Sequence, residues 1–149
     1  MILQPNGSVL IWDSREIPPV GNFVSVLWSG FVSPELVNSV SIPSLIEENA
    51  VALRGRYLSW LHELGGLQID DRRLIDHLEI RPRFSYWWMT LLAEKCNYSK
   101  SPQIKDVISL FAFDEWARHF PNIRHIELVS ENQELQECLK NWCETKKIS

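Results

Sequence analysis

Residues 8–28 read SVLIWDSREIPPVGNFVSVLW, and the two apolar runs in this stretch, SVLIW and FVSVLW, decide the fold class. Both runs are rich in β-branched and aromatic residues and are bounded by Gly, Pro, Asn or Asp, which is typical of buried strands. The connection between them, DSREIPPVGN, is shorter than the roughly dozen residues that a parallel crossover needs. The two strands are therefore expected either to be antiparallel neighbours, which would make a mixed sheet, or not to pair directly.

The middle of the chain has helical patterns. Residues 41–66 read SIPSLIEENAVALRGRYLSWLHELGG, in which Ser44 and Glu47 have capping-box spacing and Gly65 and Gly66 supply a stop signal. Apolar residues recur at helical spacing between these ends, so we expect one long amphipathic helix. A short helical turn is expected over residues 71–78.

Residues 81–95, RPRFSYWWMTLLAEK, predict a further helix with Pro82 near its first position. Arg81 and Arg83 would lie beside its N-terminus, where the helix dipole disfavours cations unless an anion is present. That anion is either a ligand phosphate or a protein carboxylate such as Asp13 or Glu79. Packing alone also explains the apolar residues, because they form one continuous helical face: Phe84, Trp87, Trp88, Leu91 and Leu92.

The last third of the chain completes an α/β order. A helix is expected from Pro102 to about Trp116, followed by a buried strand at residues 125–130 (HIELVS) and an amphipathic helix over residues 131–147. The fold class predicted is α/β, a Rossmann-like three-layer domain with a small, mostly parallel or mixed sheet and a helical middle section. A strand followed by a helix normally leads to another parallel strand. This ending allows the sheet to continue in residues that this chain lacks. The length and apolar content indicate that residues 1–149 form a single domain.

Composition and charge exclude several classes of protein. The 149 residues carry a net charge of −4, which gives no general attraction to nucleic acid or to anionic membranes. The N-terminus has neither a basic signal-peptide region nor an apolar run long enough for a transmembrane segment. Three cysteines indicate no disulfide framework and fit a reducing compartment. We expect a soluble, cytoplasmic protein.

Other candidate ligand residues follow from strand and helix ends. Asp13 follows the first strand, and Trp28, Ser29 and Gly30 follow the second, where open α/β sheets bind ligands. Lys100 and Ser101 precede a helix and could receive an anion. A plain turn at Gly30 and a solvated loop at Lys100 explain the same residues without a ligand.

The common catalytic and cofactor motifs are absent. Four scattered histidines show no metal-binding spacing, and no glycine-rich dinucleotide or P-loop motif occurs, so neither a metal nor a cofactor is predicted. Asp76 and His77 could orient an imidazole for a small hydrolase, but no nucleophile-elbow serine or cysteine accompanies them.

Three segments between Trp12 and Trp116 resemble the N-terminal part of a family of bacterial surface carbohydrate biosynthesis proteins from O-antigen loci: WSGF, SIPSLIEENAVALRGRYLSWLHELG and DHLEIRPRFSYWWMTLLAEKCNYSKSPQIKDVISLFAFDEW. The resemblance is most specific in FSYWWMTLLAEK and KSPQI. It implies a cytoplasmic glycosyltransferase-like protein with two Rossmann-type halves that acts on sugars or nucleotide sugars. Residues 1–149 would then be the N-terminal portion of a longer two-domain protein.

The resemblance leads to a first hypothesis for the function of the chain. It would be the N-terminal domain of a glycosyltransferase-like protein of surface polysaccharide biosynthesis, with Asp13 as the candidate general base. Arg81 and Arg83 would hold an anionic sugar or sugar nucleotide, and Ser85, Trp87 and Trp88 would contribute to its binding. The alternative hypothesis is a non-catalytic domain whose Trp-rich surface docks onto the rest of the enzyme or onto a pathway partner.

Overall fold

The computed structural model describes residues 7–33, 36, 38–93 and 102–149. The chain divides into two compact units, which we describe separately. The first, Met1–Asn49 with Ser109–Ser149, is called the sheet unit, and the second, Ala50–Ile108, is called the hairpin unit. The expectation that residues 1–149 form a single domain stays a prediction.

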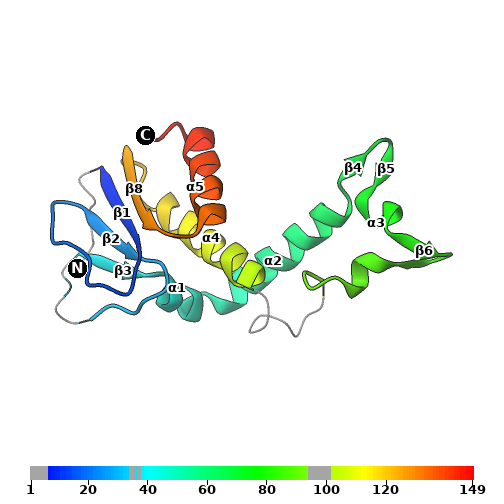
Figure 1. Cartoon of the computed structure of the whole chain (residues 1–149), viewed down its shortest axis with the longest axis horizontal. Helices are drawn as coiled ribbons and strands as arrows, with labels where there is room; N and C mark the ends of the chain where they lie inside the picture. The colour runs from blue at the N-terminus through cyan, green and yellow to red at the C-terminus, as the bar shows by residue number, and fades with distance from the viewer. Residues whose placement is uncertain (1–6, 34–35, 37, 94–101) are drawn as a thin grey trace. The chain divides into compact units, whose positions relative to one another are not determined.

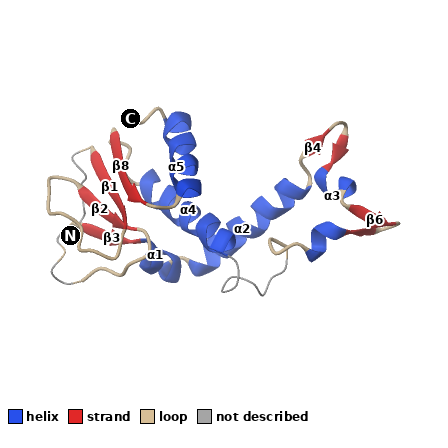
Figure 2. Cartoon of the chain, viewed as in Figure 1, coloured by secondary structure: helices blue, strands red, loops and turns tan. Residues whose placement is uncertain are grey.

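The sheet unit contains one four-stranded sheet with the strand order β3-β2-β1-β8 (Figures 1 and 2). All three neighbouring pairs are parallel. With the helices of the same unit, this sheet confirms the α/β class. The strands are β1 (Ser8–Asp13), β2 (Val24–Leu27), β3 (Ser39–Ser41) and β8 (His125–Ser130).

The expectation of an antiparallel or unpaired relation between the first two strands is wrong. β1 and β2 are directly paired and parallel, with Val9 opposite Val24 and Trp12 opposite Leu27. The four residues of β2 rise only about 13 Å along the sheet. Residues 14–23 can therefore return the chain to the start of β2 as an irregular loop, without a crossover helix.

Three helices contribute to the core of the sheet unit: α1 (Ile42–Glu48), the part of α4 (Pro102–Arg118) that begins at Ser109, and α5 (Gln133–Lys146). Figure 1 shows α4 and α5 next to the sheet. The Phe113 ring of α4 is fully buried and lies 6.2 Å from the Trp28 ring and 5.1 Å from the Trp142 ring, between centroids. One phenylalanine thus joins the end of β2, α4 and α5 in a single aromatic core.

The long helix expected over residues 44–65 is two helices, and Ser44 is not its cap. Ser41 ends β3 and is the N-cap of α1, because its hydroxyl accepts a hydrogen bond from the Ser44 amide at 3.1 Å. α1 ends at Asn49, whose amide donates to the carbonyl oxygen of Leu45, and α2 (Ala50–Gly65) follows. The capping-box spacing pointed to the wrong serine. Ser41 is placed at the start of α1 because β3, which it ends, pairs with β2, and the sequence pattern does not contain that pairing.

The hairpin unit contains α2 and a series of short elements. They are β4 (Gln68–Ile69), β5 (Arg72–Arg73), α3 (Leu74–His77), β6 (Glu79–Arg81), β7 (Phe84–Ser85) and the 3-10 helix η1 (Tyr86–Met89). β4 pairs with β5, and β6 with β7, as antiparallel ribbons. The helical turn expected over residues 71–78 is present but shorter, as α3, because Arg72 and Arg73 pair with β4.

The helix expected to start at Pro82 is wrong. Residues 82–83 form the turn between β6 and β7, and η1 is the helical part of the motif. Arg83 adopts a left-handed conformation with φ 67°, and its amide donates to Glu79 Oε1 at 2.9 Å. The Glu79 carboxylate thus satisfies the backbone amide of the turn. The helical spacing of apolar residues gives no sign of this contact.

The final strand and helix are present, as β8 and α5. The expected burial of the strand is wrong, because every residue of β8 is exposed or half-buried. Lys147 ends α5 in a left-handed conformation, and the chain then returns to β8. The Ser149 amide donates to the Arg124 carbonyl oxygen at 3.0 Å, and the Ile126 amide donates to the Ser149 carbonyl oxygen at 2.8 Å. Ser149 therefore pairs with the β8 backbone on the edge away from β1.

Within the described ranges, no helix is both long enough and apolar enough to span a bilayer.

Candidate functional site

The carboxyl ends of the parallel strands bring several predicted residues together. Asp13 ends β1, Ser130 ends β8, and Ser29 lies two residues beyond the end of β2. From β1 the chain runs to β2 and β3 on one side, while β8 lies on the other side. The strand order thus changes direction between β1 and β8, which is where open α/β sheets form ligand-binding crevices.

Asp13 is held by two serine hydroxyls. Ser29 Oγ donates to Asp13 Oδ1 at 2.9 Å, and Ser130 Oγ donates to Asp13 Oδ2 at 2.8 Å. The Ser130 hydroxyl in turn accepts from the Asn132 amide at 3.0 Å. These contacts fix the orientation of the carboxylate, while each of its oxygens retains a second lone pair for a ligand hydroxyl.

A cleft of about 640 Å³ opens beside Asp13. We call it the switch-point cleft after Asp13, although its lining residues come from β1, from β2 and from the loops that follow these two strands, and not from β8. The indole of Trp12 forms part of its wall and donates from Nε1 to the Glu16 carbonyl oxygen at 2.8 Å. Besides Asp13, the cleft is lined by both polar and apolar side chains, among them Trp12, Arg15, Glu16, Leu27, Ser29 and Phe31. This mixture of a carboxylate, a guanidinium, hydroxyls and aromatic rings suits a polar ring-shaped ligand.

Two further predicted residues at this edge have structural roles. Trp28 is 3% exposed and packs on Phe113, so its ring belongs to the core and not to the cleft. Gly30 does line the cleft, and its carbonyl oxygen accepts from Ser41 Oγ at 2.8 Å. Gly30 thereby ties the loop after β2 to the cap of α1.

The other predicted ligand residues belong to the hairpin unit. Arg81 is exposed, and its guanidinium carbon lies 4.9 Å from the centroid of the Phe84 ring, a cation–π contact. Arg83 is also exposed, at the turn. Neither arginine lies at a helix N-terminus, so the dipole argument for an anion at these residues no longer applies.

Of Ser85, Trp87 and Trp88, the first two are buried and the third is exposed. Ser85 Oγ donates to the Ile75 carbonyl oxygen and accepts from the Trp87 amide at 3.2 Å. Trp87 is 4% exposed and lies against Gly65, whereas Trp88 is 60% exposed. Trp87 is thus a core residue of the hairpin unit, and of the two indoles Trp88 is the one accessible to a ligand or partner.

Asp76 and His77 each have a partner in the hairpin unit. Arg73 donates to both Asp76 carboxylate oxygens, at 2.7 and 2.8 Å, and this hydrogen bonding lowers the pKa of Asp76 below its ordinary value. His77 Nε2 lies 2.7 Å from the Ile69 carbonyl oxygen. The two side chains therefore stabilise the ends of α3 and of the β4–β5 ribbon.

Lys100 and Ser101 lie outside the described residues. In the part of the chain that the structure does describe, no group of three or more His, Cys, Asp or Glu side chains is placed to hold a metal ion.

Sequence reasoning missed Ser130, Arg15 and Trp12 as site residues. Ser130 is the last residue of the strand HIELVS, and in a parallel sheet that position lies at the same edge as Asp13. The signal was present in the sequence, but it becomes informative only when β8 is known to pair with β1. Arg15 was overlooked because the loop after β1 was expected to be only a connection, and Trp12 because it was assigned only to the apolar strand β1.

Comparisons of this chain with protein-family models, with curated proteins and with solved structures gave no match.

Proposed function

We propose that the sheet unit binds an anionic sugar or a sugar nucleotide in the switch-point cleft. In this proposal the chain is the N-terminal domain of a glycosyltransferase-like protein of bacterial surface polysaccharide biosynthesis. The observation that carries the ligand assignment is Asp13, held by Ser29 and Ser130 at the β1–β8 switch point on the wall of a 640 Å³ cleft. That volume lies within the range of about 300–1,000 Å³ that small-molecule sites occupy.

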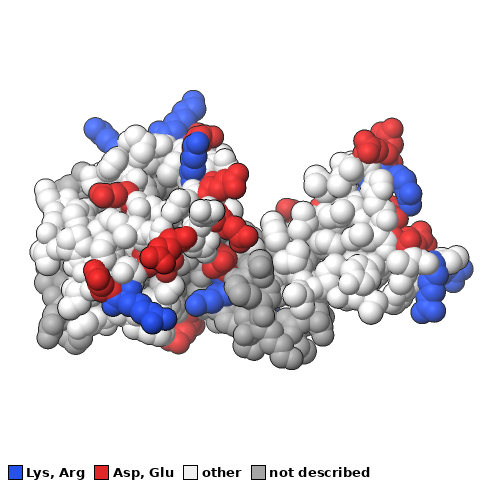
Figure 3. Space-filling model, viewed as in Figure 1, with Lys and Arg blue, Asp and Glu red and all other residues white. Residues whose placement is uncertain are grey.

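The chemistry of the cleft supports a sugar-like ligand. The Asp13 carboxylate can accept hydrogen bonds from sugar hydroxyls, and the Arg15 guanidinium can pair with a phosphate or a sugar carboxylate. The rings of Trp12 and Phe31 provide apolar faces for a sugar or a base. Figure 3 shows both positive and negative side chains on the drawn face of the sheet unit, so the anion specificity assigned here is local to the cleft.

The remaining parts of the proposal concern the larger protein. The parallel sheet would belong to a Rossmann-like, three-layer half of a two-halved enzyme. Asp13 would act as general base toward an acceptor hydroxyl, since a base must lie within hydrogen-bond reach of the proton that it removes. Arg81 and Arg83 remain candidate anion ligands in the hairpin unit, where both are exposed.

A titration tests the ligand assignment. The intact chain is titrated with CMP, UDP, GDP and their sugar conjugates while tryptophan fluorescence is recorded, because Trp12 lies in the cleft wall. We expect saturable binding. Arg15→Gln should weaken it by about tenfold or more, because the variant loses a charge-assisted hydrogen bond to the ligand. Asp13→Asn should also weaken it.

The matched control is Arg124→Gln, which removes an exposed arginine just before β8, at the amino end of the sheet. This variant should bind like the unmodified chain. A folded protein that responds to none of the nucleotides or conjugates would refute the assignment.

A non-catalytic docking domain is the second candidate function. The observation that favours it is the exposed apolar surface of the hairpin unit at and after η1, formed by Tyr86, Trp88, Met89 and Leu91. Concentration-dependent association that Trp88→Ser abolishes, with no nucleotide binding, would support docking over ligand binding.

A further inference from the structure

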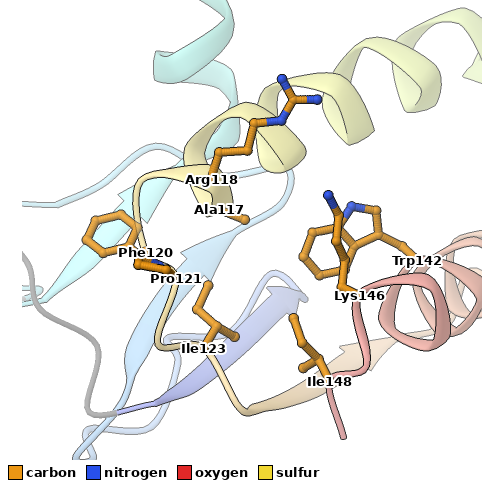
Figure 4. A pocket seen from close by; sticks show the side chains of 8 residues that line it. All are labelled: Ala117, Arg118, Phe120, Pro121, Ile123, Trp142, Lys146 and Ile148. Atoms are coloured by element: carbon orange, nitrogen blue, oxygen red, sulfur yellow. The ribbon is translucent and has the colours of Figure 1, made fainter.

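A second cavity lies in the sheet unit, at the opposite end of β8 from the switch-point cleft. It has a volume of about 210 Å³ and is bounded by the end of α4, the segment leading into β8 and the end of α5 (Figure 4). Ile123 and Ile148 line it close to His125, the first residue of β8. His125 and Ser130 are five residue steps apart, about 16 Å along the strand, so the two cavities are separate.

The walls of this cavity combine polar and apolar surface, and the apolar part is fixed in place. Ala117 and Ile123 are buried. The Trp142 indole is held by a hydrogen bond from Nε1 to Asp114 Oδ1 at 3.0 Å and by its ring contact with Phe113. A ligand that enters the cavity therefore meets a preformed apolar wall and does not have to order it.

Two cations lie at one side of the cavity. In Figure 4 the Arg118 guanidinium and the Lys146 ammonium group lie above, and the side chains of Ile123 and Ile148 lie below. Arg118 Nη2 is 2.8 Å from Asp114 Oδ2, and Lys146 Nζ is 3.6 Å from Asp114 Oδ1.

The two cations thus share one carboxylate that is largely buried. Glu115 is the other described acidic partner, 3.4 Å from Arg118 Nη1, and its side chain is about half exposed. Solvent screens that outer pair more strongly than the inner one. The Lys146 ammonium also lies 5.8 Å from the centroid of the Trp142 ring, a long cation–π contact. Because the ammonium has three donors and its contact with Asp114 is long, it retains capacity for a second acceptor.

We propose that this cavity binds a small carboxylate with a flat apolar ring. The ring would lie between Trp142 and the isoleucines, and the carboxylate would accept hydrogen bonds from Lys146 and Arg118. A cavity of about 150 Å³ lined by aliphatic and aromatic side chains holds a benzene molecule. A cavity of 210 Å³ therefore has room for a single six-membered ring that carries one carboxylate. The inference is independent of the sugar-ligand proposal, because none of its residues lines the switch-point cleft.

The probe is benzoate, with the neutral isostere benzamide as the comparison ligand. The intact ¹⁵N-labelled chain is titrated with each while the indole N–H signal of Trp142, assigned with Trp142→Phe, is followed by NMR. Saturable shifts with benzoate are expected. Lys146→Gln and Arg118→Gln should each weaken benzoate binding by about fivefold or more and leave benzamide binding unchanged.

Three further variants separate a specific site from a general charge effect. Lys140→Gln removes an exposed lysine of α5 that does not line the cavity, and Asp13→Asn alters only the switch-point cleft. Both should leave benzoate binding unchanged. Ile148→Phe fills the cavity from the C-terminal segment and should weaken both ligands.

The proposal is overturned if benzoate does not saturate the folded chain. It is also overturned if Lys140→Gln weakens benzoate binding as much as Lys146→Gln does, or if Ile148→Phe leaves both ligands bound as before.

Discussion

Gly55 and Gly65 lie in the same helix, α2, and differ in what surrounds them. A methyl group added at Gly55 meets no atom within 4 Å, whereas at Gly65 it lies 3.2–3.4 Å from the Trp87 ring. Gly55→Ala should therefore stabilise the hairpin unit by about 0.5–1 kcal/mol, because alanine loses less backbone entropy in a helix. Gly65→Ala should destabilise it by about 1 kcal/mol or more, because the indole is enclosed and must shift.

Thermal unfolding followed by circular dichroism measures both changes, and each glycine serves as the control for the other. Equal stabilisation by the two alanines would contradict the packing of Trp87 on Gly65.

At the scale of elements, Ser41 joins a strand to a helix. Its hydroxyl accepts from the Ser44 amide and donates to the Gly30 carbonyl oxygen. Ser41→Ala should destabilise the sheet unit by about 1–2 kcal/mol, because it removes both the N-cap of α1 and the anchor of the loop after β2. Urea unfolding measures the change.

Ser44→Ala is the matched control, since Ser44 has the capping-box spacing but contributes only its backbone amide to the cap. We expect its effect to stay within about 0.5 kcal/mol. If Ser44→Ala lost more stability than Ser41→Ala, Ser44 would be the cap, as the sequence pattern suggested, and the assignment of Ser41 would be wrong.

At the scale of the whole sheet unit, stability depends on the aromatic core around Phe113. Its ring contacts the rings of Trp28, Trp116 and Trp142, which come from the end of β2, from α4 and from α5. Phe113→Ala should cost about 3–5 kcal/mol in the free energy of unfolding, because it leaves a cavity at the junction of sheet and helices. Phe113→Leu should lie between this variant and the unmodified chain.

Urea unfolding again supplies the measurement, with Phe31→Ala as the control. Phe31 is 62% exposed, so its truncation should change stability by no more than about 0.5 kcal/mol. Similar costs at positions 31 and 113 would mean that the core does not lie where these ring contacts put it.

The candidate site was only partly predictable. Asp13 and Ser29 were found because they follow apolar runs that read as strands, and strand ends are local features of a sequence. Ser130 was missed because its role needs β8 beside β1, a pairing between residues more than one hundred positions apart. Arg81 and Arg83 were assigned to a helix N-terminus that the structure replaces with a hairpin.

The sequence alone determined the α/β class, the strands at both ends of the chain and the helices α4 and α5, because burial periodicity is a property of neighbouring residues. Only the tertiary structure decided the parallel pairing of β1 with β2, the division between α1 and α2, and the hairpin at Arg83. Each of these depends on partners that a linear pattern does not contain. They are the neighbouring strands, the Ser41 hydroxyl that bonds both the loop after β2 and the first turn of α1, and the Glu79 carboxylate that accepts from the turn amide. Hydrogen bonds of this kind outweigh local helical preference because a buried or strained backbone group without a partner costs more than the propensity that is given up.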